Sequence, residues 1–107
     1  MDNFKVIYKI LKVLEKAMDL EEFDKKLIGH QELELTEPRW NRIMAMMVSD
    51  GLIRGVDIRN TFDCDYPKAT LIRPEITLKG LEYLEENSLM KKVADAAKGI
   101  KDIVPGL

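Results

Sequence analysis

The fold of this chain is decided by residues 36–55, Thr-Glu-Pro-Arg-Trp-Asn-Arg-Ile-Met-Ala-Met-Met-Val-Ser-Asp-Gly-Leu-Ile-Arg-Gly. Thr36 is a favoured N-cap because its hydroxyl can accept a backbone N–H, and Pro38 is tolerated in a first helical turn that needs no donor. Asp50-Gly51 ends the predicted helix, with Gly51 as the left-handed residue. Between these ends the apolar residues recur at helical spacing and share one face: Trp40, Ile43, Met44, Met47 and Val48.

After this helix the chain changes to a strand-like composition. In Leu52–Ile58, the side chains of Val56 and Ile58 fall on one face of a predicted strand. A helix that leads directly into a ribbon is typical of a winged helix. We therefore predict an α+β fold, namely a helix-turn-helix with a two- to three-stranded β-wing, followed by C-terminal helices.

The residues before this stretch predict a helix, a strand and a turn. Phe4–Met18 has an apolar stripe at helical spacing and lysines on the opposite side, which predicts an amphipathic helix. We expect Phe23–Ile28 to form a short strand that pairs with the wing. His30–Leu35 predicts a tight turn, with Glu34 where such turns often have glycine. The helix that begins after Thr36 would then be offered to a major groove.

The residues after this stretch predict a wing loop and two helices. Arg59–Pro74 is poor in apolar residues and rich in turn formers, so we expect it to form the wing loop. Thr77 would cap a helix whose leucines face inward, and Gly80 would let that helix approach a neighbouring backbone closely. The leucines are Leu78, Leu81 and Leu84. We divide the chain into a winged-helix domain, residues 1–87, and a C-terminal helix, residues 88–107, that packs on the first helix or forms a dimerisation arm.

Composition excludes several classes of function. The 107 residues suit one domain, and a formal net charge of −2 does not favour a protein that coats nucleic acid or anionic membrane. No apolar run approaches the roughly 20 residues that cross a bilayer, and no signal-peptide pattern is present, so a cytoplasmic location is expected. Cys64 and His30 are the only residues of their kinds, which excludes a zinc site built from cysteine and histidine. We find no nucleophile setting, no phosphate-binding glycine loop and no cofactor motif, and we expect no enzymatic activity.

Four parts of the sequence carry a family resemblance: Phe4–Leu11, Arg39-Trp40 with Ile43 and Met47, Asp50–Ile53, and Ile76–Ser88. On these residues the chain resembles the YjcQ-like family of small winged-helix proteins, which are found in Gram-positive bacteria and their prophages. The likeness covers nearly the whole chain. It implies a winged-helix fold and no established activity, because a fold alone does not define a function.

The arginines point to a binding surface. All of them lie in the predicted recognition helix and ribbon: Arg39, Arg42, Arg54, Arg59 and Arg73. The planar arginine fork pairs with phosphate and with guanine edges. We predict a dimeric DNA-binding regulator, in which one set of side chains faces the groove of double-stranded DNA and a second set contacts its backbone from the wing. The first set is Arg39, Asn41, Arg42 and Met46, and the second is Arg59 and Lys68. A bacterial or prophage origin is what the family resemblance implies.

A second interpretation remains open because acidic side chains outnumber basic ones between residues 21 and 50. Phosphate contacts supply most nonspecific affinity for DNA, and an acidic surround weakens them. The same exposed face, including Pro38, would then dock on a partner protein. In both interpretations we expect Trp40 to belong to the core, packed against Ile10 or Leu14.

Overall fold

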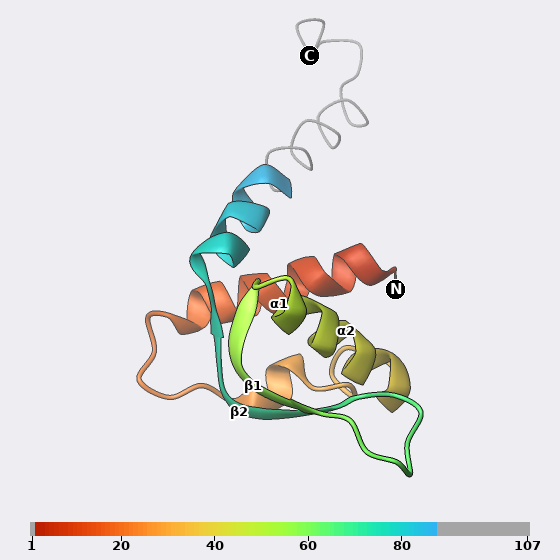
Figure 1. The fold of residues 1–107 in the computed structure, drawn as a ribbon. Helices are drawn as coiled ribbons and strands as arrows, with labels where there is room; N and C mark the ends of the chain where they lie inside the picture. The colour runs from red at the N-terminus through yellow and green to blue at the C-terminus, as the bar shows by residue number, and fades with distance from the viewer. Residues whose placement is uncertain (1, 88–107) are drawn as a thin grey trace, which may run out of the picture.

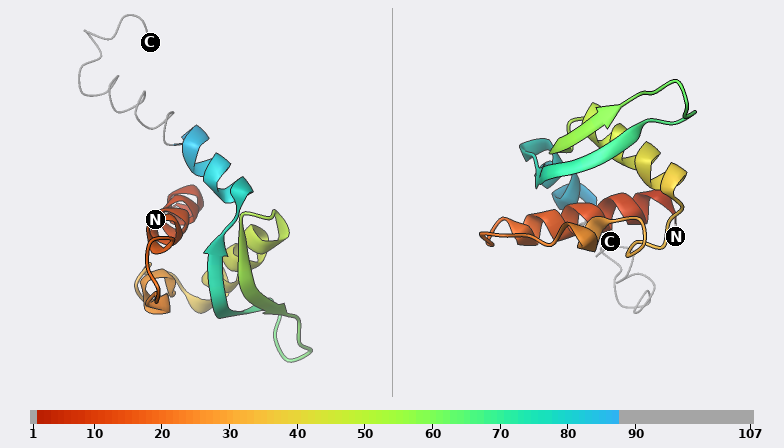
Figure 2. Two further views of the ribbon diagram at one scale, coloured as in Figure 1. Left: turned by 90° about the vertical axis from the view of Figure 1, so that its left-hand side faces the viewer. Right: turned by 90° about the horizontal axis from the view of Figure 1, so that it is seen from below.

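The structure, a computed structural model, describes residues 2–87 and has an α+β architecture (Figure 1). In chain order it contains α1 (Asn3–Ala17), a short 3-10 helix η1 (Lys25–Ile28), α2 (Glu37–Ser49), β1 (Ile53–Arg59) and β2 (Lys68–Ile76). A further helix occupies residues 78–87. Both α1 and α2 lie on one side of the β1–β2 hairpin, whose loop and the helix 78–87 are at opposite ends (Figure 2). The predicted C-terminal helix and arm, residues 88–107, lie outside the described residues.

The first helix matches the predicted amphipathic pattern. Asp2 caps α1, because its Oδ1 accepts a hydrogen bond of 2.9 Å from the backbone N–H of Lys5. One side of the helix supplies four fully or almost fully buried residues to the core, which are Val6, Ile10, Leu11 and Leu14. No helix among residues 2–87 is long and apolar enough to cross a membrane.

The predicted strand over Phe23–Ile28 is wrong. Asp24 instead caps η1, because its Oδ1 accepts a hydrogen bond of 3.0 Å from the N–H of Lys26. An aspartate that bonds its own backbone two residues on favours a turn over a strand. The Lys25 ammonium donates to the carbonyl oxygens of Leu71 and Ile72 at 3.4 and 3.2 Å. A charged group therefore lies at the edge of β2 where a third strand would pair, and the described sheet has two strands.

The predicted bounds of α2 are confirmed at both ends. The Thr36 hydroxyl accepts a hydrogen bond from the N–H of Arg39, and Gly51 has a left-handed φ of 76°. Trp40 is buried, as predicted, in the same core as Ile10 and Leu14. Its indole N–H donates to the carbonyl of Ile28 at 2.8 Å. Trp40 thus joins α2 to η1 through a bond that satisfies its one polar atom.

The two strands form the predicted antiparallel hairpin, with an irregularity at its base. Ile53 pairs with Ile76 and Arg59 with Lys68, and the register shifts between Arg54 and Val56. Gly55 lies at this shift with φ 78°, where an added Cβ would overlap the carbonyl of Arg73. Because β2 already begins at Lys68, the hairpin loop is residues 60–67, shorter than the predicted Arg59–Pro74 loop.

The helix 78–87 begins as predicted but uses a different face. The Thr77 hydroxyl accepts a hydrogen bond of 3.1 Å from the N–H of Gly80, and a Cβ at Gly80 would overlap the carbonyl of Leu52. Close approach therefore places Gly80 and, one turn later, buried Leu84 against the core. Leu78 is almost opposite Gly80 around the helix and is 74% exposed, so its predicted inward position is wrong.

We predict that Gly55→Ala lowers the free energy of unfolding by at least about 2 kcal/mol, since a left-handed residue with a side chain costs roughly 1–2 kcal/mol before any overlap with Arg73. Gly51→Ala is the matched control. It has a similar φ, but its Cβ would meet only a side-chain carbon of Lys79 at 3.8 Å. Urea unfolding followed by Trp40 fluorescence measures both variants, and equal costs would show that the overlap at Gly55 is unimportant.

We predict that Glu34→Gly leaves the protein equally stable or makes it more stable by up to about 1 kcal/mol. Glu34 is exposed and has φ 56°, a conformation that costs an L-residue roughly 1–2 kcal/mol, partly offset by the greater chain entropy of unfolded glycine. Glu34→Val should be clearly less stable than the wild type in the same urea titration. A destabilised glycine variant would mean that the Glu34 side chain makes a favourable interaction.

Candidate nucleic-acid interface

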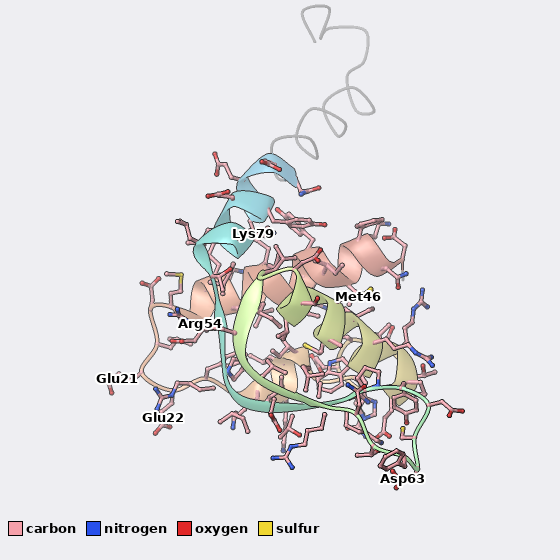
Figure 3. The ribbon with its side chains drawn as sticks, in the orientation of Figure 1. Glu21, Glu22, Met46, Arg54, Asp63 and Lys79 are labelled. Carbon is pink, nitrogen blue, oxygen red and sulfur yellow. The ribbon has the colours of Figure 1, made fainter. Side chains whose placement is uncertain are left out.

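The exposed side of α2 carries three of the residues predicted to face a groove. Arg39, Arg42 and Met46 follow one another at helical spacing, and all three are exposed. The Arg39 Nε donates to the side-chain oxygen of Asn3 at 2.9 Å, which aligns the guanidinium with the start of α1. The Met46 side chain is 52% exposed and lies near the other end of α2 (Figure 3). This row of side chains gives the exposed side of α2 two guanidinium groups, with an apolar methionine side chain toward the C-terminal end of the helix.

Asn41 does not belong to this row, and its predicted groove-facing position is wrong. Only 5% of Asn41 is exposed. Its Oδ1 accepts a hydrogen bond of 2.7 Å from the N–H of Ala69, and its Nδ2 donates to the carbonyl of Glu37 at 2.9 Å. The side chain therefore points from α2 toward β2 and holds the two elements together. Its role is to position the surface, because both ends of its amide are already bonded inside the protein.

Tyr66 brings two of the predicted contact residues together. The Arg42 Cζ lies 5.5 Å from the centre of the Tyr66 ring, and the Lys68 Nζ lies 5.0 Å from it. A cation within about 6 Å of an aromatic face is attracted to it. A side-chain hydrogen bond with Tyr66 also raises the pKa of Lys68, which favours its charged form. We call Arg42, Tyr66 and Lys68 the cation–ring cluster, since it joins α2 to the hairpin at the surface.

Tyr66 was not predicted from the sequence as a residue of this surface. The available signal was an aromatic residue within the turn-rich segment, between Asp65 and Pro67 and two residues before Lys68. Its packing against a residue of α2 depends on how the loop folds, which the local sequence pattern does not show.

A shallow hollow of about 550 Å³ separates the N-terminal half of α2 from the hairpin loop. Acidic groups share it with the cations. Hydrogen bonds from the Thr61 side chain and from the backbone lower the pKa of Asp63, so this carboxylate is ionised at neutral pH. The lining residues are Pro38, Arg42, Asp63, Cys64, Asp65, Tyr66 and Lys68. Figure 3 places Asp63 at the tip of the loop.

Arg59, the other predicted wing contact, is separate from this cluster. Its Nε is 2.7 Å from the Oδ2 of Asp57, and its side chain is 77% exposed. This ion pair, with Asp57 on the same strand, partly neutralises the positive charge of Arg59. Within residues 2–87, no hydrogen bond or ion pair joins Arg59 to α2.

His30 takes part in local packing. Its ring meets that of Trp40 edge-on, with 6.4 Å between the ring centres, and its Nε2 lies 3.5 Å from the Oε1 of Glu37. Within the part of the chain that the structure describes, no group of three or more His, Cys, Asp or Glu side chains is placed to hold a metal ion.

Comparison with known protein families assigns the chain to a family on the basis of its sequence. The profile of the YjcQ protein family matches residues 8–103, which is most of the chain. The chain therefore belongs to the YjcQ family, in agreement with the resemblance seen in its sequence. No curated protein and no solved structure matched it.

We predict that Asn41→Ala destabilises the fold by about 1–3 kcal/mol, because it leaves the partly buried N–H of Ala69 without its acceptor. Amide hydrogen exchange at Ala69 should accelerate with it. The control is Asn60→Ala in the exposed hairpin loop, which we expect to change stability by less than about 0.5 kcal/mol. Unchanged exchange at Ala69 in the Asn41 variant would show that this bond does not hold the hairpin on α2.

Proposed function

We propose that this protein is a small winged-helix DNA-binding protein in which α2 enters the major groove and the hairpin contacts the flanking backbone. The cation–ring cluster carries the proposal, because it connects the exposed row of α2 to Lys68 on the hairpin. The order of α1, η1, α2 and a β-hairpin supports the winged-helix assignment. In it, η1 takes the place of the helix that precedes the recognition helix.

The residue types suit a division between base and phosphate contacts. Arg39 and Arg42 can each pair bidentately with guanine, and Met46 offers an apolar contact of the kind that thymine methyl groups accept. Lys68, at the start of β2, suits a phosphate. Even if all three cations contacted phosphates in nonspecific binding, the slope of log affinity against log salt would be only about −2.7, so nonspecific binding is expected to be weak. Specific base contacts would have to supply the selectivity of a transcription regulator.

One observation favours a second function, a protein-interaction module that does not bind DNA. Phe62 is fully exposed at the tip of the hairpin loop, beside Asp63 and close to Asp65. An exposed aromatic residue next to carboxylates would approach a phosphate backbone unfavourably, whereas it suits a basic surface on a partner protein. The row of Arg39, Arg42 and Met46 would then lie at the edge of the same contact.

We predict that the purified protein enriches a sequence motif from a random DNA pool. On the best site, Arg39→Ala and Arg42→Ala should each lose about 5- to 150-fold in affinity, equivalent to 1–3 kcal/mol per lost base contact. Lys68→Ala should lower the salt slope by about one, with little change in sequence preference. Titration at several salt concentrations measures these quantities.

The control is Lys16→Ala, which removes an exposed cation from the last turn of α1. It should leave both affinity and salt slope unchanged. If no motif is enriched, and all four variants bind as weakly as the wild type, the DNA proposal is wrong. The interaction module would then be tested by comparing partners captured by the wild type with those captured by Phe62→Ser and Arg42→Ala.

A further inference from the structure

A second hollow, of about 490 Å³, lies away from the cation–ring cluster. It is bounded by the end of α1, the segment that follows α1, and β2. Three large apolar side chains that line it are well exposed, namely Met18 at 62%, Leu20 at 59% and Ile72 at 60%. We call it the α1–β2 groove. Figure 3 shows its acidic rim at Glu21 and Glu22, with Arg54 across from them on β1.

The groove follows an edge of the sheet that is only partly covered. The carbonyl oxygens of Leu71 and Ile72 accept hydrogen bonds from the Lys25 ammonium. No strand among residues 2–87 pairs with this edge of β2. Unpaired strand edges beside apolar side chains are commonly covered in native proteins. The groove therefore combines exposed apolar side chains with an unpaired strand edge, and both would be covered if a further apolar segment bound there.

The two rims of the groove differ in charge. Glu21 and Glu22 are exposed, and no ion pair is formed by either of them in the described structure. On the opposite rim the Arg54 guanidinium is paired with Glu75 at 3.2 Å, and Arg73 adds a positive charge. An occupant with lysines toward the first rim and a carboxylate toward the second would complement both.

Residues 88–107 of the same chain have this composition. They contain more lysines than aspartates, although the whole chain has a net charge of −2. Near their end, Ile100, Ile103 and Val104 are interspersed with charged residues, Lys98, Lys101 and Asp102. The YjcQ family match extends to residue 103, so it includes most of this segment.

The length of chain is sufficient for the segment to reach the groove. Ile76 lines the groove, and the helix 78–87 starts two residues later, after its capping residue Thr77. At about 1.5 Å per residue this helix carries the chain roughly 14 Å away. Residues 88–107 span about 66 Å when extended at roughly 3.3 Å each, so the segment can return along the helix and still cover the groove.

We propose that the α1–β2 groove is the docking site of residues 88–107 of the same molecule. Ile100, Ile103 and Val104 cover Met18, Leu20 and Ile72, while Lys98 and Lys101 face the acidic rim. This docking closes the open edge of β2.

The test is a disulfide cross-link in the full chain, with Cys64→Ser as background. Met18→Cys combined with Ile103→Cys should oxidise within one molecule at least about tenfold faster than Met46→Cys combined with Ile103→Cys, because docking raises the effective concentration of the paired thiols. Met18 and Met46 are both exposed methionines, which makes the second pair a matched control. Mass spectrometry and nonreducing gels at several dilutions distinguish bonds within a chain from bonds between chains.

Charge reversal provides an independent readout. Glu21→Lys with Glu22→Lys should slow the cross-link several-fold, whereas Asp63→Lys with Asp65→Lys on the hairpin loop should not. If Met18→Cys disturbs the circular dichroism spectrum, Ile72→Cys replaces it on the other wall of the groove. Equal rates for the groove pair and the Met46 control would overturn the proposal. So would bonds formed only between chains and lost on dilution, because the occupant would then be a second copy.

Discussion

The hydrogen bond from the Ala69 N–H to the Asn41 side chain fixes how the hairpin sits on α2, and the surface described above depends on it. The neighbouring residue, Trp40, bonds in another direction to the carbonyl of Ile28. Consecutive residues of one helix thus hold η1 and β2. Both bonds are formed by groups largely removed from water, where an unpaired donor is costly, so they restrict the orientation of the elements more strongly than apolar packing alone.

Much of the fold was predictable because local chemistry marks its boundaries. Thr36 and Gly51 delimit α2, and Gly80 shows where two backbones meet. The segment before α2 was predicted wrongly, since its apolar residues fit either a strand or a helical turn. The helical turn is selected by the Asp24 carboxylate, which caps its own backbone, and by the hydrogen bonds of Lys25 to Leu71 and Ile72. Leu71 and Ile72 lie 46 and 47 positions further along the chain. A contact across such a separation leaves no periodic pattern in the local sequence.

Less of the candidate site was predictable, for a related reason. Helical spacing placed Arg39, Arg42 and Met46 correctly on the exposed side of α2. It did not show that Asn41 faces the hairpin, because a polar residue at the border of an apolar stripe is compatible with either side. Tyr66 was missed because its contact with Arg42 of α2 forms only when the hairpin loop folds back toward that helix. Residue type therefore identified the charged groups, whereas tertiary structure determined which of them act together.

The balance of charges around the cation–ring cluster limits what it can bind. Arg42 and Lys68 are both positively charged, and their attraction to the face of Tyr66 offsets part of their mutual repulsion. Ionised Asp63 lines the same hollow, so a phosphate that entered there would meet a negative charge as well as the cations. An anionic ligand is therefore disfavoured at the loop tip and favoured along the side of α2 that carries Arg39 and Arg42, and beside Lys68. A surface this narrow gives little long-range attraction, so selective binding has to arise from contacts made after docking.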